Sequence, residues 1–258
     1  MDVGLRDARA LVTAGGAGIG HAVAAALAAE GARVWVVDRD LPDGLPALGV
    51  HPVAVDLLQP AAVAGVIGDL VAAEGRIDVL VNCLGGPSGD DRGFLAQDDE
   101  AWQRTLERNL LVAVRACRAA IPHMLGAGGG AIVNVASDLA RQPDPRFVDY
   151  AAAKAALLSL TKSLSMEFGP AVRVNAVSPG PTRTPGFVQH FFDHVGPASG
   201  VGGEEAIRRY VHEERTMPSG RLGTPEEVAA AVVFAASGVA AQMTGAELVI
   251  DGGVRKQV

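Results

Sequence analysis

Residues 11–20 read LVTAGGAGIG, and this stretch decides how the rest of the chain is interpreted. It opens with apolar residues typical of a buried strand and passes through glycines. It then leads into an alanine-rich run at 21–30 that suits a helix. A helix that starts directly after such a loop offers free backbone N–H groups and the positive end of its dipole to an anion. The stretch therefore predicts a strand, a phosphate-binding loop and a helix.

The loop departs from the common G-x-G-x-x-G spacing of dinucleotide-binding loops, because Ala14 stands where a first glycine is expected. Alanine causes no strain if φ is negative at this position. If φ is positive, it costs about 1 kcal/mol or more. Gly15 and Gly16 follow directly and leave the turn extra freedom, so we expect Ala14 to be tolerated.

The alternation of short β-branched runs with longer Ala/Leu-rich runs continues along the chain, which is typical of successive β-α units. We expect a single α/β domain over residues 1–258, a Rossmann-like, doubly wound parallel sheet of about seven strands with helices on both faces. Further strands are expected at 33–38, 51–56, 77–82, 131–137, 173–178 and 246–251, and a helix from Tyr150 to about Phe168.

Residues 183–222, which we call the lid segment, interrupt this alternation. The segment is rich in Gly and Pro and contains Phe187, Phe191 and Phe192, three of the seven phenylalanines. A connection of this length in a compact domain is often functional, so it predicts a lid over a substrate. A surface excursion without a binding role is the alternative.

Composition limits the partners. The formal charge is −7 and no Lys/Arg cluster occurs, which argues against nucleic acid or an anionic membrane surface and favours a small-molecule substrate. The sequence has no group of Cys and His residues at metal-ligand spacing, so no metal site is predicted. It has only two cysteines, which are too few for a disulfide framework, and this predicts a reducing, cytoplasmic location. The sequence contains no run of 18 or more apolar residues, so no membrane span is predicted.

Asp38 ends the strand predicted at 33–38, about 20 residues after the glycine loop. There its carboxylate can accept hydrogen bonds from the ribose hydroxyls of an adenosine and repel a 2′-phosphate. This favours NAD as the cofactor and makes NADP less likely to bind. Arg39 is adjacent and could bind such a phosphate, although neighbouring strand residues point to opposite faces.

Tyr150 and Lys154 lie four residues apart at the start of a predicted helix and so share one face. A cation close to a phenol lowers its pKa from about 10, which would make the tyrosine a usable acid or base near neutral pH.

The chain resembles the short-chain dehydrogenases/reductases of the Tyr-x-x-x-Lys type, from about Leu5 to Gly253. The motifs TAGGAGIG, VNCLGG, ERNL, VNVAS, YAAAK and SPGPTRTP follow one another at the spacings of that family, and Ser137 precedes Tyr150 by 13 residues as usual there. The resemblance implies that Tyr150 is the catalytic acid/base and that Lys154 binds the nicotinamide ribose and lowers the tyrosine's pKa. It further implies that Ser137 orients the substrate oxygen and that Asn109 holds a water in a proton relay to Lys154.

The same resemblance implies the cofactor contacts and a homo-oligomer, most often a tetramer in this family. Cys83 and Leu84 depart from its Asn-Asn-Ala-Gly motif, and Leu84 could reshape the adenosine side. The implied contacts are Thr13, Gly16, Gly18, Ile19, Asp38, Asp56, Leu57, Asn82, Cys83, Tyr150, Lys154, Pro179, Gly180 and Thr182.

We therefore expect an NAD(H)-dependent oxidoreductase that interconverts a secondary alcohol and a ketone. Two alternatives stay open at this point. One is an NADPH-dependent ketoreductase of polyketide or fatty-acid type. The other is a dinucleotide-sensing protein without catalytic activity.

Overall fold

The computed structural model describes residues 3–87 and 93–256, so residues 1–2, 88–92 and 257–258 of the predicted 1–258 domain lie outside the described residues. Within these residues seven strands pair in parallel in the order β3-β2-β1-β4-β5-β6-β7. The predicted fold class is confirmed. The strands are β1 Arg9–Thr13, β2 Arg33–Asp38, β3 His51–Ala54, β4 Val79–Asn82, β5 Gly130–Val135, β6 Val172–Pro179 and β7 Glu247–Ile250.

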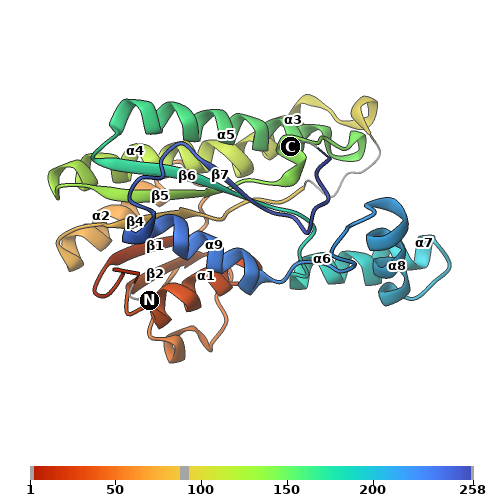
Figure 1. The fold of residues 1–258 in the computed structure, drawn as a ribbon, viewed down its shortest axis with the longest axis horizontal. Coiled ribbons are helices and arrows are strands. Elements are labelled where there is room, and N and C mark those ends of the chain that lie inside the picture. Colours follow the sequence, from red (N-terminus) through yellow and green to blue (C-terminus); the bar gives the residue numbers. More distant parts are fainter. Residues whose placement is uncertain (1–2, 88–92, 257–258) are drawn as a thin grey trace.

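Helices cover both faces of the sheet, as Figure 1 shows: α4 and α5 lie along one side, α1 and α9 along the other. Neighbouring residues of β1 point to opposite layers, as the period of two in a strand requires. Leu11 packs in the core with α2 and α4, whereas Val12 packs in the core with α1 and α9. The main helices are α1 Gly18–Ala29, α2 Ala62–Glu74, α3 Asp99–Leu106, α4 Val112–Gly126, α5 Val148–Phe168 and α9 Pro225–Ala236.

The helical stretch from α3 to α4 is continuous in the chain but changes its hydrogen bonding in the middle. A π-helical stretch, η3 (Glu107–Leu111), separates α3 from α4 and contains Asn109. Such single-turn π segments are rare and occur often at functional sites. The widened turn was not predicted, because the periodicity of apolar residues does not distinguish it from an α-helix.

The lid segment is helical rather than loop-like. It lies apart from the sheet, beyond the carboxyl ends of the strands (Figure 1). Its core includes Phe187 and Phe191, whose rings are 4.7 Å apart, and Tyr210, whose ring lies 5.1 Å from that of Phe191. Its elements are α6 Pro185–His190, η6 Phe191–Val195, α7 Gly196–Ala198, α8 Gly203–Arg209 and η7 Tyr210–Glu214.

The strand order reverses between β1 and β4, so the connections leave these two strands in opposite directions. In open α/β sheets a crevice forms at the carboxyl ends of the strands at this point, and ligands bind there. Register aligns Thr13 with Asn82 and Asn82 with Asn134 along this edge. The fold thus brings polar side chains from β1, β4 and β5 to one place.

Candidate active site

The glycine loop joins β1 to α1 and is closely packed. A Cβ on Gly20 would lie 2.1 Å from the carbonyl oxygen of Ala14, and one on Gly16 would lie 2.2 Å from the carbonyl oxygen of Asp40. Gly18 has φ +55°, a conformation that favours glycine. These contacts explain why glycine stands at 16, 18 and 20.

Ala14 itself has φ +54°, so it adopts the positive, strained conformation rather than the unstrained one with negative φ. An alanine in this left-handed region costs about 1–2 kcal/mol, because its Cβ approaches the following carbonyl oxygen. The loop keeps its shape in spite of this cost. Ala14 is therefore tolerated as predicted, but it lowers the stability of the folded protein.

The start of α1 offers unpaired donors beside the crevice. The residue before it, Ala17, makes no side-chain cap, and no acidic residue lies in the first turn. The free N–H groups and the helix dipole suit the phosphates of a dinucleotide. Ile19, expected to contact the cofactor, lies in this first turn and is half-buried.

Asp38 lies beside the loop, as predicted. Its Oδ2 accepts a hydrogen bond from the N–H of Gly16 at 3.0 Å, and its Oδ1 accepts one from the N–H of Arg39 at 2.7 Å. The Arg39 guanidinium pairs with Asp40 at 2.8 Å and is largely exposed to solvent. An ionised carboxylate has about four acceptor sites, so Asp38 retains capacity for two further hydroxyl donors.

The residues expected around the adenine follow β3. Asp56 accepts a hydrogen bond from the N–H of Leu58 at 3.0 Å, which fixes the turn, and Leu57 is buried. The turn therefore leaves the Asp56 carboxylate half-buried at the carboxyl edge of the sheet.

Thr13 connects the end of β1 to the segment after β4. Its hydroxyl accepts from the N–H of Cys83 at 3.0 Å and of Leu84 at 3.3 Å. Asn82 donates to the side chain of Asn134 at 2.8 Å, while its own Oδ1 is buried without a partner among the described residues. These bonds hold the segment that carries Cys83 and Leu84 against the crevice despite the altered motif.

Asn109 and Lys154 meet at Gly85. A Cβ on Gly85 would lie 2.6 Å from Oδ1 of Asn109 and 2.7 Å from Nζ of Lys154. Asn109 also accepts from the N–H of Gly86 at 2.9 Å and donates to the carbonyl oxygen of Thr105 at 3.0 Å. The π-helical turn thus directs its buried asparagine to the lysine.

Tyr150 and Lys154 lie in the first turns of α5. The Lys154 ammonium donates to the carbonyl oxygen of Val135 at 2.8 Å and lies 5.7 Å from the centroid of the Tyr150 ring. Ser137 follows two residues after Val135, so the lysine is anchored to the end of the strand that leads to the serine. The four predicted catalytic residues converge at one end of the sheet.

The pKa of Tyr150 differs in direction from the expectation. Burial raises it to about 12, the Ser137 hydroxyl lowers it, and the negative charge of Asp138 raises it. Burial also lowers the pKa of Lys154 to about 8, against a small opposing effect of Cys83. In this structure, therefore, desolvation outweighs the effect that the lysine was expected to have on the phenol.

The segment after β6 is fixed by backbone contacts. Gly180 donates its N–H to the carbonyl oxygen of Ile250 at 3.0 Å, and a Cβ there would lie 2.7 Å from Cα of Asp251. The buried Thr182 donates its hydroxyl to the carbonyl oxygen of Gly180 at 2.9 Å. Pro179 is the last residue of β6, so this turn lies beside the other predicted cofactor contacts.

Two features of the site were not predicted. Asp138, next to Ser137, forms a buried ion pair with Arg215 of the lid segment. Arg146 pairs with Asp144 at 2.8 Å and with Glu214 at 3.0 Å, so its guanidinium already has two carboxylate partners. Asp138 follows the predicted serine directly, but nothing in the sequence pairs it with a residue 77 positions away.

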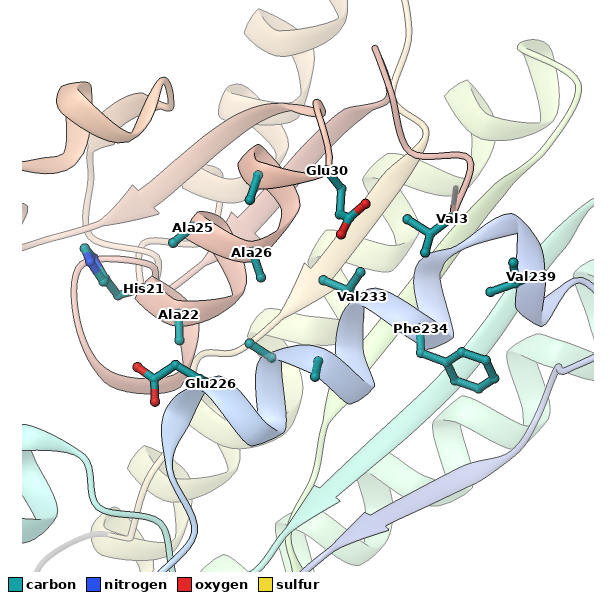
Figure 2. Close-up of a pocket in the computed structure, with 13 residues that line it drawn as sticks. Val3, His21, Ala22, Ala25, Ala26, Glu30, Glu226, Val233, Phe234 and Val239 are labelled. Carbon is teal, nitrogen blue, oxygen red and sulfur yellow. The ribbon is translucent and has the colours of Figure 1, made fainter. Parts of the chain in front are cut away.

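A surface pocket lies between α1 and α9 (Figure 2). Alanines of both helices line it, together with Val233, Phe234 and His21. Its described lining contains none of the predicted catalytic or cofactor-binding residues.

The described residues, 3–87 and 93–256, offer neither a metal-binding cluster nor a membrane-spanning helix. No group of three or more His, Cys, Asp or Glu residues in them could hold a metal ion. No helix there is long and apolar enough to cross a membrane.

Comparison with known proteins extends the motifs to nearly the whole chain. A family model described as enoyl-(acyl carrier protein) reductase matches residues 13–255. The short-chain reductase protein NovJ of Streptomyces niveus is 36% identical, over 96% of this chain and 94% of NovJ. D-threitol dehydrogenase of Mycolicibacterium smegmatis is 39% identical, over 95% of this chain and 91% of that protein. The structure of L-sorbose reductase from Gluconobacter frateurii, complexed with NADPH and L-sorbose, matches with a TM-score of 0.93 and 32% identity, over 100% of both chains.

Proposed function

Because the protein belongs to the short-chain dehydrogenase/reductase family, an enzyme family acting on CH–OH groups, we propose that it interconverts a secondary alcohol and a ketone with NAD(H). The observation that carries this proposal is the convergence of Asn109, Ser137, Tyr150 and Lys154 at the carboxyl end of the sheet. A bound nicotinamide dinucleotide supplies the hydride acceptor or donor.

Tyr150 exchanges the proton of the substrate oxygen. With a pKa raised to about 12, the phenol is protonated at neutral pH and can donate to the oxygen of a ketone. Ser137 orients that oxygen through its hydroxyl. Lys154, whose pKa is lowered to about 8, can hold or release a proton near neutrality, and Asn109 lies beside it to extend the relay.

The cofactor preference rests on Asp38. Gly16 lets the loop pack against Asp38 and Asp40, since a Cβ there would clash with both, and the start of α1 provides donors for phosphate. A carboxylate at the ribose favours NAD, while Arg39 is occupied by Asp40. NADPH remains the second candidate, because L-sorbose reductase is described with it.

The substrate we propose is a polyhydroxylated alcohol or the corresponding ketose. Two relatives support it by name, D-threitol dehydrogenase and L-sorbose reductase. The lid segment at 183–222 covers the substrate. The ion pair of Arg215, in this segment, with Asp138, next to Ser137, supports this role.

The test is turnover of a panel of polyols and ketoses with NAD(H) and with NADP(H), together with fluorescence titration of both reduced cofactors. We expect NADH to bind more tightly and Asp38→Ala to erode this preference. Tighter binding of NADPH would favour a biosynthetic ketoreductase. Binding of NADH without turnover of any alcohol or ketone would favour a dinucleotide sensor.

Membership of this family also supports a proposal about assembly and location. We propose a homotetramer in the cytoplasm, a reducing compartment. The two cysteines, Cys83 and Cys117, are free thiols, and burial raises the pKa of each to about 12.

A further inference from the structure

Asp149 is a buried carboxylate beside the tyrosine of the proposed reaction. It lies in the first turn of α5, directly before Tyr150, and is only 1% exposed. An acidic residue in the first turn of a helix can stabilise the helix dipole from the surface, where its charge stays hydrated. A buried charge is costly unless hydrogen bonds compensate for the lost water. The burial of Asp149 therefore depends on the donors around it.

Among the described residues, three donors surround this carboxylate. Its Oδ1 accepts from the N–H of Tyr150 at 2.8 Å and from Nε2 of Gln97 at 3.3 Å. Its Oδ2 accepts from the hydroxyl of Thr105 at 2.6 Å, a length typical of a hydrogen bond to a charged acceptor. Thr105 belongs to α3 and is 3% exposed. This bond therefore joins the end of α3 to the first turn of α5 inside the protein.

Thr105 also holds the asparagine of the π-helical turn. Its carbonyl oxygen accepts from Nδ2 of Asn109 at 3.0 Å, and the carbonyl oxygen of Gly86 accepts from the same nitrogen at 3.1 Å. These two bonds use both hydrogens of the amide. Oδ1 of Asn109 accepts from the N–H of Gly86 at 2.9 Å, so the amide is held in one orientation. Thr105 thus contacts Asp149 through its hydroxyl and Asn109 through its carbonyl.

Asn109 and Lys154 reach the same place from different elements. Oδ1 of Asn109 and Nζ of Lys154 lie 2.6 Å and 2.7 Å from the position that a Cβ on Gly85 would occupy. Asn109 belongs to the turn that follows α3, whereas Lys154 belongs to α5. The separation of the two side chains therefore depends on how α3 and α5 are fixed to each other.

Resting on the proposed function, we propose that Thr105 and Asp149 are positioning residues for the proton relay. Their hydrogen bond fixes α3 to the helix that carries Tyr150 and Lys154, and the Thr105 carbonyl orients Asn109. Neither residue needs to contact the substrate or the cofactor. Loss of the bond lets Asn109 shift relative to Lys154, which slows the proton step and leaves cofactor binding unchanged.

The experiment follows NADH formation in a single turnover with the polyol that the wild type oxidises best, because product release does not limit this rate. Thr105→Val replaces the hydroxyl by a methyl group of similar size. We expect its rate at saturating polyol to fall about tenfold, the effect of a small misplacement of a reacting group. The half-saturating polyol concentration and the dissociation constant of NADH should stay within about twofold. Thr105→Ser keeps the hydroxyl and should recover most of the rate.

A double-mutant cycle tests whether Thr105 acts through Asn109. In an Asn109→Ala background the positioned group is gone, so Thr105→Val should lower the rate by less than about twofold there. A general loss of packing would instead cost the same factor in both backgrounds, because independent effects add in free energy.

Thr161 of α5 provides a matched control, since it also carries a buried hydroxyl and is 2% exposed. It lies two turns beyond Lys154, accepts from Asn134 at 2.9 Å and donates to the carbonyl oxygen of Leu157 at 2.8 Å. Thr161→Val should lower the melting temperature, as Thr105→Val does, because each leaves a buried polar partner without its hydrogen bond. Its single-turnover rate should stay within about twofold of the wild type.

If Thr105→Val does not fold, Thr105→Val/Asp149→Leu takes its place, because apolar groups then replace both partners and no lone carboxylate is buried. Its rate should still be about tenfold low. The positioning role is wrong if the folded variant keeps the wild-type rate, if it costs the same factor with and without Asn109, or if Thr161→Val costs as much. An active wild type with any of these results leaves the proposed function standing. A wild type inactive on every alcohol and ketone would overturn both.

Discussion

Single residues in this site lower the stability of the folded protein, and Ala14 is the simplest case. Its φ of +54° is one that glycine adopts at no steric cost. We predict that Ala14→Gly raises the free energy of unfolding by up to about 1 kcal/mol, since glycine removes the strain but adds chain entropy. Thermal melting should show a rise of about 2–4 °C.

Ala17 provides the matched control in the same loop. Its φ is −150°, where alanine is unstrained, so Ala17→Gly relieves no backbone strain and should stabilise the protein less than Ala14→Gly does. Equal stabilisation by both variants would show that general loop flexibility, not the conformation at 14, is responsible.

Lys154 gives a second prediction at this scale, and it concerns pH. Burial lowers its pKa from 10.5 to about 8, so between these values the unfolded chain carries more protons on this lysine than the folded chain. Stability from this group therefore rises with pH across that interval and is lowest below pH 8. Lys154→Met should melt at a higher temperature than the wild type at pH 7, and the difference should shrink as pH approaches 10. A difference that is constant with pH would contradict the burial of the charge.

At the scale of elements, the contact between β1, the glycine loop and α1 is the tightest part of the cofactor region. A Cβ on Gly20 would lie 2.1 Å from the carbonyl oxygen of Ala14, whereas Gly65 of α2 has no atom within 4 Å of such a Cβ. Gly20→Ala should destabilise the protein by about 1–3 kcal/mol through overpacking and weaken NADH binding. Gly65→Ala should stabilise it by up to about 1 kcal/mol through helix propensity.

Urea unfolding and cofactor titration check both variants. A Gly20→Ala protein as stable as Gly65→Ala would mean that the loop and helix separate easily, which would contradict the close packing described here.

The elements also show how much of the structure could be predicted from the sequence. The strands and the helix expected from Tyr150 to Phe168 lie where the sequence predicted them, because strands buried on both faces form short continuous runs of β-branched residues. The helical content of the lid segment was not predicted, since its glycines and prolines are typical of a loop. The π-helical turn at Asn109 and the pair of Asp138 with Arg215 depend on contacts between distant segments, and no local pattern encodes these.

For the whole molecule, exposed apolar side chains on outer elements favour assembly. Met166 of α5 is 74% exposed and Phe234 of α9 is 44% exposed. Apolar surface of this kind often marks an interface between subunits. We predict that light scattering at micromolar concentration gives a mass several times the 26.4 kDa of one chain. Phe234→Glu should reduce it, and a wild-type mass of one chain would refute the proposed assembly.

The central claim is that Tyr150 handles the proton in an alcohol–ketone reaction. The most direct measurement compares Tyr150→Phe with the wild type in NADH binding and in turnover of the best polyol. We predict NADH binding nearly unchanged and turnover abolished, because phenylalanine keeps the ring but has no proton to exchange. Substantial turnover by Tyr150→Phe would contradict the account.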